Sequence, residues 1–82
     1  MDLSIIIACS RPSSIRDCLR SLEIQSGNFQ FEVLIVGLVE KIRDENFQLE
    51  WRALACKEPH PNVRRNIGLE NAKSQMIAFL DD

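Results

Sequence analysis

Four short apolar segments, separated by polar stretches, set the pattern of this sequence. Residues 3–9 and 31–36 are rich in β-branched side chains and are apolar on both faces, which is typical of parallel strands covered by helices on each side. Residues 51–56 and 75–80 have the length and apolar content of two further strands. The pattern therefore predicts four strands.

Helices are predicted between these strands. The first has an apolar face at helical spacing, formed by Ile15, Cys18, Leu19 and Leu22. Ser14 and Asp17 resemble a capping box, so this helix is expected to begin at Ser14. Asn62 is placed to cap another helix that extends through Ala72, and a short helix is expected over residues 40–47.

The alternation of strands and helices predicts an α/β fold with a mostly parallel sheet and flanking helices. In such a sheet the carboxyl ends of the strands share one edge, and ligands bind just outside it. That edge is expected to gather residues 9–11, 37–38 and 81–82, with the amino end of the helix at Asn62 close by. A crevice for a nucleotide is the natural hypothesis.

Two adjacent carboxylates, Asp81 and Asp82, directly follow the last apolar run. Paired carboxylates at a strand end suit Mg²⁺ or Mn²⁺, which proteins usually hold through one or two carboxylates together with the oxygens of a substrate phosphate. The alternative interpretation is a solvated acidic terminus. This segment alone leaves both open.

Two arginines, Arg64 and Arg65, fall in the first turn of the second predicted helix. The helix dipole opposes cations at this end, so their presence indicates a phosphate ligand or a carboxylate partner, with Asp81 and Asp82 as the obvious partners. The alternative is structural, with one arginine solvated and the other in a salt bridge. Gly68 inside the helix costs about 1 kcal/mol relative to alanine, so it is expected to pack closely against the sheet.

Composition narrows the class of protein. The 82 residues allow one domain, and a net charge of −2 gives no general attraction to nucleic acid or to an anionic membrane. The three cysteines form no CxxC pair and do not cluster with the single histidine, His60, so neither a disulfide framework nor a zinc site is indicated. Residues 3–9 are too short to span a bilayer and do not follow a basic segment. A cytoplasmic location is therefore expected.

Several segments resemble the amino-terminal half of the family 2 glycosyltransferases. The most specific is Arg65-Asn66-Ile67-Gly68-Leu69, followed by Ala72-Lys73 and by an apolar strand that ends in Asp81-Asp82. Residues 3–7, 18–22 and 31–36 agree with the same pattern. The resemblance implies a Rossmann-like GT-A fold of the nucleotide-diphospho-sugar transferase type. It covers nearly the whole of residues 1–82.

The resemblance implies a nucleotide-sugar donor site and a divalent metal, Mn²⁺ or Mg²⁺. Asp82 and Asp81, as a DXD-type motif, are the implied metal ligands, and the metal would neutralise charge on the departing nucleoside diphosphate. The implied donor-binding residues are Ala8, Cys9, Ser10, Arg11, Gly37, Arg65, Asp81 and Asp82. The reaction would be an inverting transfer of the sugar to an acceptor sugar or lipid-linked glycan.

The sequence also departs from this family. Gly37 stands where members usually carry an aspartate that reads the base, so nucleotide preference is open. No catalytic base is assigned: the resemblance places it, with the acceptor half, beyond an acidic motif at which residues 1–82 would be truncated. The 82-residue chain is thus expected to be inactive by itself, and a non-catalytic remnant or binding module of the same fold is the alternative. A receiver-like phosphoacceptor domain is disfavoured because Ala8-Cys9-Ser10 contains no acidic residue.

Overall fold

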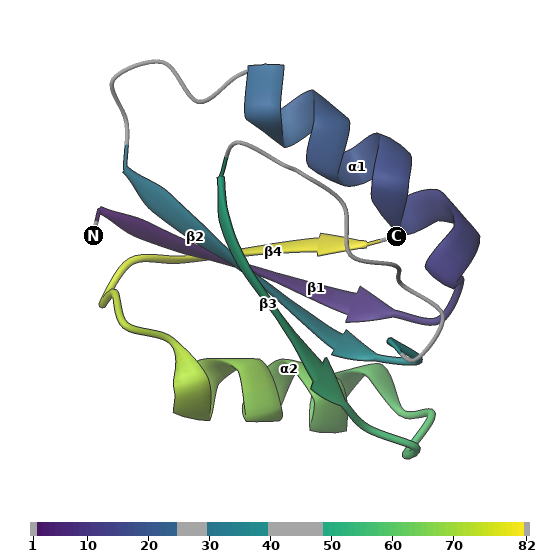
Figure 1. Ribbon diagram of the computed structural model, residues 1–82. Coiled ribbons are helices and arrows are strands. Elements are labelled where there is room, and N and C mark those ends of the chain that lie inside the picture. The colour runs from purple at the N-terminus through teal and green to yellow at the C-terminus, as the bar shows by residue number, and fades with distance from the viewer. Residues whose placement is uncertain (1, 25–29, 40–48, 82) are drawn as a thin grey trace.

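A parallel sheet lies at the centre of the computed structural model (Figure 1). The structure describes residues 2–24, 30–39 and 49–81, with the backbone alone at residues 12–14 and 81. Within these residues the sheet has the strand order β3-β2-β1-β4, and every neighbouring pair is parallel. The strands are β1 (Leu3–Cys9), β2 (Phe31–Gly37), β3 (Glu50–Ala55) and β4 (Ile77–Asp81). The predicted α/β fold with a parallel sheet is confirmed.

Helices α1 (Pro12–Ile24) and α2 (Pro61–Asn71) cover opposite faces of this sheet, as Figure 1 shows. Successive residues of a strand point to opposite faces, so the two central strands supply both layers of the core. On the α1 side a buried cluster joins the sheet to the helix, through Ile5, Ile7, Cys9, Val33, Ile35, Ile15 and Leu19. On the other side a Cβ added to Gly68 of α2 would lie 2.5 Å from Ile6 Cγ2. The predicted close packing of Gly68 against the sheet is confirmed.

The two helices begin at prolines, where the sequence analysis expected other residues. Helix α1 begins at Pro12 rather than Ser14. Helix α2 begins at Pro61 with His60 as its N-cap, because His60 Nδ1 accepts a hydrogen bond of 3.2 Å from the Asn62 amide. The prediction that Asn62 is the cap was therefore wrong. Proline suits the first helical position because its φ is fixed near the helical value. It lacks a backbone N–H, but an N–H at this position would have no partner within the helix.

Strand β1 spans the predicted residues, and several other boundaries differ by one or two residues from those predicted. Strand β3 begins and ends one residue earlier, and β4 begins at Ile77 rather than residue 75 and ends at Asp81. Helix α2 ends at Asn71, with Ala72 as its C-cap. The helix predicted over residues 40–47 lies outside the described residues.

A buried carboxylate ties the amino ends of the strands to the connection between α2 and β4. Glu32 is fully buried and accepts hydrogen bonds from Ser4 Oγ at 2.7 Å, the Lys73 amide at 2.6 Å and Arg52 Nη2 at 3.2 Å. The Ser74 amide donates to Ser4 Oγ over 3.1 Å. Burial raises the pKa of Glu32, but these hydrogen bonds outweigh it and hold the pKa below its ordinary value of 4.5. The cluster fixes where β4 starts, and so where it ends at the opposite edge.

Candidate functional site

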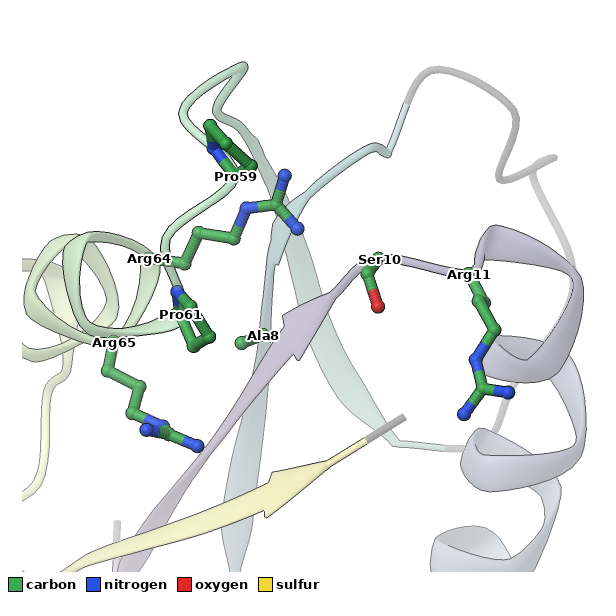
Figure 2. Close-up of a pocket in the computed structure, with 7 residues that line it drawn as sticks. All are labelled: Ala8, Ser10, Arg11, Pro59, Pro61, Arg64 and Arg65. Carbon is green, nitrogen blue, oxygen red and sulfur yellow. The ribbon is translucent and has the colours of Figure 1, made fainter.

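A pocket of about 250 Å³ lies at the carboxyl edge of the sheet, where the sequence predicted a ligand. The end of β1, the residues that lead into α1, the loop before α2 and the first turns of α2 surround it (Figure 2). The described lining residues are Ala8, Ser10, Arg11, Pro59, Pro61, Arg64 and Arg65. Three of these seven are arginines and none is acidic, so the described part of the pocket is suited to an anion.

Arg64 is the buried cation of this pocket. Only 3% of the residue is exposed, and its guanidinium bridges two backbone segments. Arg64 Nη1 donates to the Cys9 carbonyl oxygen at 2.6 Å, and Nε donates to the Glu58 carbonyl oxygen at 2.8 Å. These bonds join the end of β1 to the loop that leads into α2. Arg64 is therefore a fixed part of the pocket wall.

Arg65 and Arg11 are more exposed and approach the pocket from different elements. Arg65 Nη1 donates to Asn62 Oδ1 at 3.2 Å, and its guanidinium carbon lies 5.9 Å from the centre of the Phe79 ring, within the range of a cation–π contact. Figure 2 shows Arg64 and Arg65 on the α2 side and Arg11 on the α1 side, with the Ser10 hydroxyl between them. Four of the residues predicted for donor binding thus line one pocket: Ala8, Ser10, Arg11 and Arg65.

Two other predicted site residues, Cys9 and Gly37, are not among the described lining residues of the pocket. Cys9 is fully buried on the α1 side of the sheet, where its Sγ donates to the Leu38 carbonyl oxygen at 3.7 Å. Its contribution to the site is the backbone carbonyl that Arg64 binds. Gly37 has a φ of 139°, and a Cβ there would collide with the Cys9 carbonyl oxygen. Gly37 therefore permits the close approach of β1, β2 and Arg64.

The two predicted metal ligands lie at the end of β4. Asp81 pairs with Ala8 in the register of β1 and β4, which brings its backbone beside a residue that lines the pocket. The side chain of Asp81 and all of Asp82 lie outside the described part of the structure. Within the described part, no group of three or more His, Cys, Asp or Glu side chains could hold a metal ion. The register therefore places the backbone of Asp81 at the same edge of the sheet as the pocket.

Sequence reasoning overlooked Arg64 as the buried member of the arginine pair. The signal was present, because Arg64 precedes Gly68 by four residues and positions four apart lie on the same face of a helix. Gly68 was expected to face the sheet, so Arg64 should face it as well. Glu32 and Arg52 were also overlooked, since only the register of β1, β2 and β3 brings them together.

Comparison with known proteins found no matching family model, no matching curated protein and no matching solved structure. Within residues 2–24, 30–39 and 49–81, no helix has the length and apolar character needed to cross a bilayer.

Proposed function

We propose that this chain binds the nucleotide-sugar donor of an inverting glycosyltransferase. The observation that supports the proposal best is the arginine-lined pocket at the carboxyl edge of a parallel sheet, beside the strand that ends in Asp81. Open α/β sheets bind nucleotides at this edge, and arginine is well suited to phosphate oxygens. The sequence resemblance to family 2 glycosyltransferases supplies the class of ligand.

Different residues would contact different parts of the donor. Arg11, Arg64 and Arg65 face the phosphates, and the end of β1 at Ala8 and Ser10 provides the surface beside them. Asp81 and Asp82 would hold Mn²⁺ or Mg²⁺, which would supply charge neutralisation for the departing nucleoside diphosphate. The acceptor would be a sugar or a lipid-linked glycan.

No described residue is assigned as the catalytic base. The single histidine, His60, is the N-cap of α2, and its Nδ1 accepts the Asn62 amide. An inverting transfer needs a base within hydrogen-bonding reach of the acceptor hydroxyl. The proposal for residues 1–82 is therefore donor binding.

A binding module without catalysis is the second candidate, and Gly37 favours it. The glycosyltransferases that this sequence resembles read the base with a carboxylate at this position, whereas Gly37 has no side chain and no room for one. Such a module would bind phosphates while discriminating weakly among bases.

Calorimetric titration of the purified chain with uridine, guanosine and cytidine diphosphates, and with the corresponding diphosphosugars, tests the proposal in Mn²⁺. Donor binding predicts saturable one-to-one binding of at least one diphosphosugar, more tightly than of inorganic phosphate. Equal affinity for every nucleotide favours the binding module. Absence of diphosphosugar binding at millimolar concentration would contradict both.

A further inference from the structure

Arg64 places a positive charge at the wall of the pocket, and its protein contacts do not neutralise it. Both described partners of its guanidinium are carbonyl oxygens, which solvate a cation but carry no net charge. No carboxylate in the described part of the chain forms an ion pair with it. The side chain of Glu58, whose carbonyl oxygen Arg64 binds, accepts the His60 amide at 3.4 Å instead. A buried arginine with no counter-charge among the described residues favours a bound anion.

The neighbouring charges have the same sign. Arg11 and Arg65 line the same pocket of about 250 Å³, and its described lining contains no Asp or Glu. An anion bound in this pocket provides the counter-charge that Arg64 lacks among the described residues.

The size and donors of the pocket indicate which anion fits. A volume of about 250 Å³ lies below the roughly 300–1,000 Å³ of sites that enclose a whole small molecule. It is enough for a charged group and too small for a complete nucleotide-sugar. The planar, forked guanidinium donates two parallel hydrogen bonds to phosphate oxygens. Figure 2 shows Arg64 and Arg65 on the α2 side of the pocket and Arg11 beside the start of α1.

We propose that the pocket binds a phosphate or diphosphate group through Arg11, Arg64 and Arg65 without a divalent cation. The inference rests on the proposed function only in assigning that diphosphate to a nucleotide-sugar. A metal held at Asp81 and Asp82 then adds affinity to a site that the arginines have already formed.

The test is titration of the purified 82-residue chain with inorganic pyrophosphate in EDTA, followed by calorimetry at fixed ionic strength. We expect saturable binding, weakened about tenfold in Arg64→Gln and in Arg65→Gln, which is the loss expected for one charged hydrogen-bonding partner. Arg20→Gln is the matched control, because it removes the same charge from the exposed side of α1 and should change affinity by less than about twofold.

A second variant keeps the test decisive if Arg64→Gln fails to fold. Arg11 is exposed and precedes α1, so Arg11→Gln should leave the circular dichroism melt unchanged and still weaken pyrophosphate binding. Absence of pyrophosphate binding in EDTA, or an equal loss in Arg20→Gln, would overturn the proposal.

Competition separates this inference from the proposed function. Pyrophosphate that binds in EDTA but is not displaced by any diphosphosugar supports the arginine site and argues against donor binding. Diphosphosugar binding that occurs only with Mn²⁺, together with no pyrophosphate binding in EDTA, supports donor binding and overturns the arginine site.

Discussion

The guanidinium of Arg64 lies where a side chain at Gly37 would have to be. A Cβ built on Gly37 would stand 2.9 Å from Arg64 Nη1 and would also collide with the Cys9 carbonyl oxygen that Nη1 binds. The Gly37 carbonyl oxygen accepts the Cys56 amide at 3.0 Å. One glycine thus allows the ends of three strands and a buried arginine to meet at the edge of the pocket.

Substitution of Gly37 is therefore expected to destabilise the fold. Gly37→Ala should lower the free energy of unfolding by at least about 1–3 kcal/mol, since a φ of 139° is strained for any residue with a Cβ. Gly37→Asp should lower the free energy of unfolding further. It should not increase the affinity for uridine diphosphate, because its carboxylate cannot be accommodated beside Arg64. Urea denaturation measures both. Ala53→Val, at an exposed position of β3, is the control and should stay within about 0.5 kcal/mol.

The contact between Gly68 and Ile6 predicts a coupled pair of substitutions. Gly68→Ala would normally stabilise a helix by about 1 kcal/mol, but here the new methyl group meets Ile6 Cγ2 at 2.5 Å and should destabilise the protein. Ile6→Ala removes the colliding atoms and should itself cost about 2–5 kcal/mol. In the Ile6→Ala background, Gly68→Ala should be neutral or stabilising. Additive losses in a double-mutant cycle by urea denaturation would show that the two residues do not share this contact.

The buried Glu32 predicts a stability that depends on pH. Its pKa is lowered on folding, so its contribution is present above the unfolded-state value near 4.5 and is lost as the pH falls through the lower folded-state value. The free energy of unfolding should therefore fall as the pH drops below about 4.5. Glu32→Gln should reduce that slope and cost about 1–3 kcal/mol at neutral pH, because the amide satisfies fewer of the three donors. Glu70→Gln, on the exposed side of α2, is the control and should change neither the pH dependence nor the free energy of unfolding at neutral pH.

Local patterns predicted the elements of the fold well, and what was missed has two causes: contacts between distant residues and an unusual capping group. Runs of β-branched residues marked β1 and β2, and Gly68 inside a helical pattern marked close packing. The cluster at Glu32 could not be found in this way, because its carboxylate contacts Lys73, 41 residues away in sequence. The cap at His60 was missed because imidazole is a less usual capping group than the amide of Asn62.

The candidate site was predictable as a place rather than as a set of contacts. Parallel strands guarantee that their carboxyl ends share an edge, and Ser10, Arg11 and Arg65 meet there. The alternation of side chains along β1 determines which of its residues line the pocket. Ala8 faces the pocket, so the next side chain, Cys9, faces the core beneath α1. A one-residue difference therefore separates a lining residue from a core residue, and a segment-level prediction cannot make that distinction.

The acidic end of β4 predicts a metal-dependent gain in affinity above that of the arginines. Mn²⁺ should tighten binding of nucleoside diphosphate relative to EDTA, and Asp82→Asn should remove at least about 1.4 kcal/mol of that gain, a tenfold change, since an amide is a poorer ligand for a hard cation. Asp81→Asn should reduce it too. Paired titrations in Mn²⁺ and in EDTA separate this gain in affinity from the affinity that the arginines provide without metal. Asp17→Asn, an exposed substitution on α1, is the control, and an unchanged gain in both test variants would remove the metal role.

The chain is also expected to bind a donor without turning it over. Release of nucleoside diphosphate requires a base that deprotonates the attacking hydroxyl, and the pocket presents arginines, prolines, one alanine and one serine among its described residues. A guanidinium group donates hydrogen bonds and has no acceptor, so it is unsuited to act as that base. Binding energy spent equally on the bound donor and the transition state does not accelerate the reaction. Incubation of the purified chain with a diphosphosugar and Mn²⁺ should therefore release nucleoside diphosphate at the rate of the protein-free control, as measured by chromatography. Sustained release that depends on Mn²⁺ and is abolished in Arg65→Gln would show that these residues already form a catalytic site.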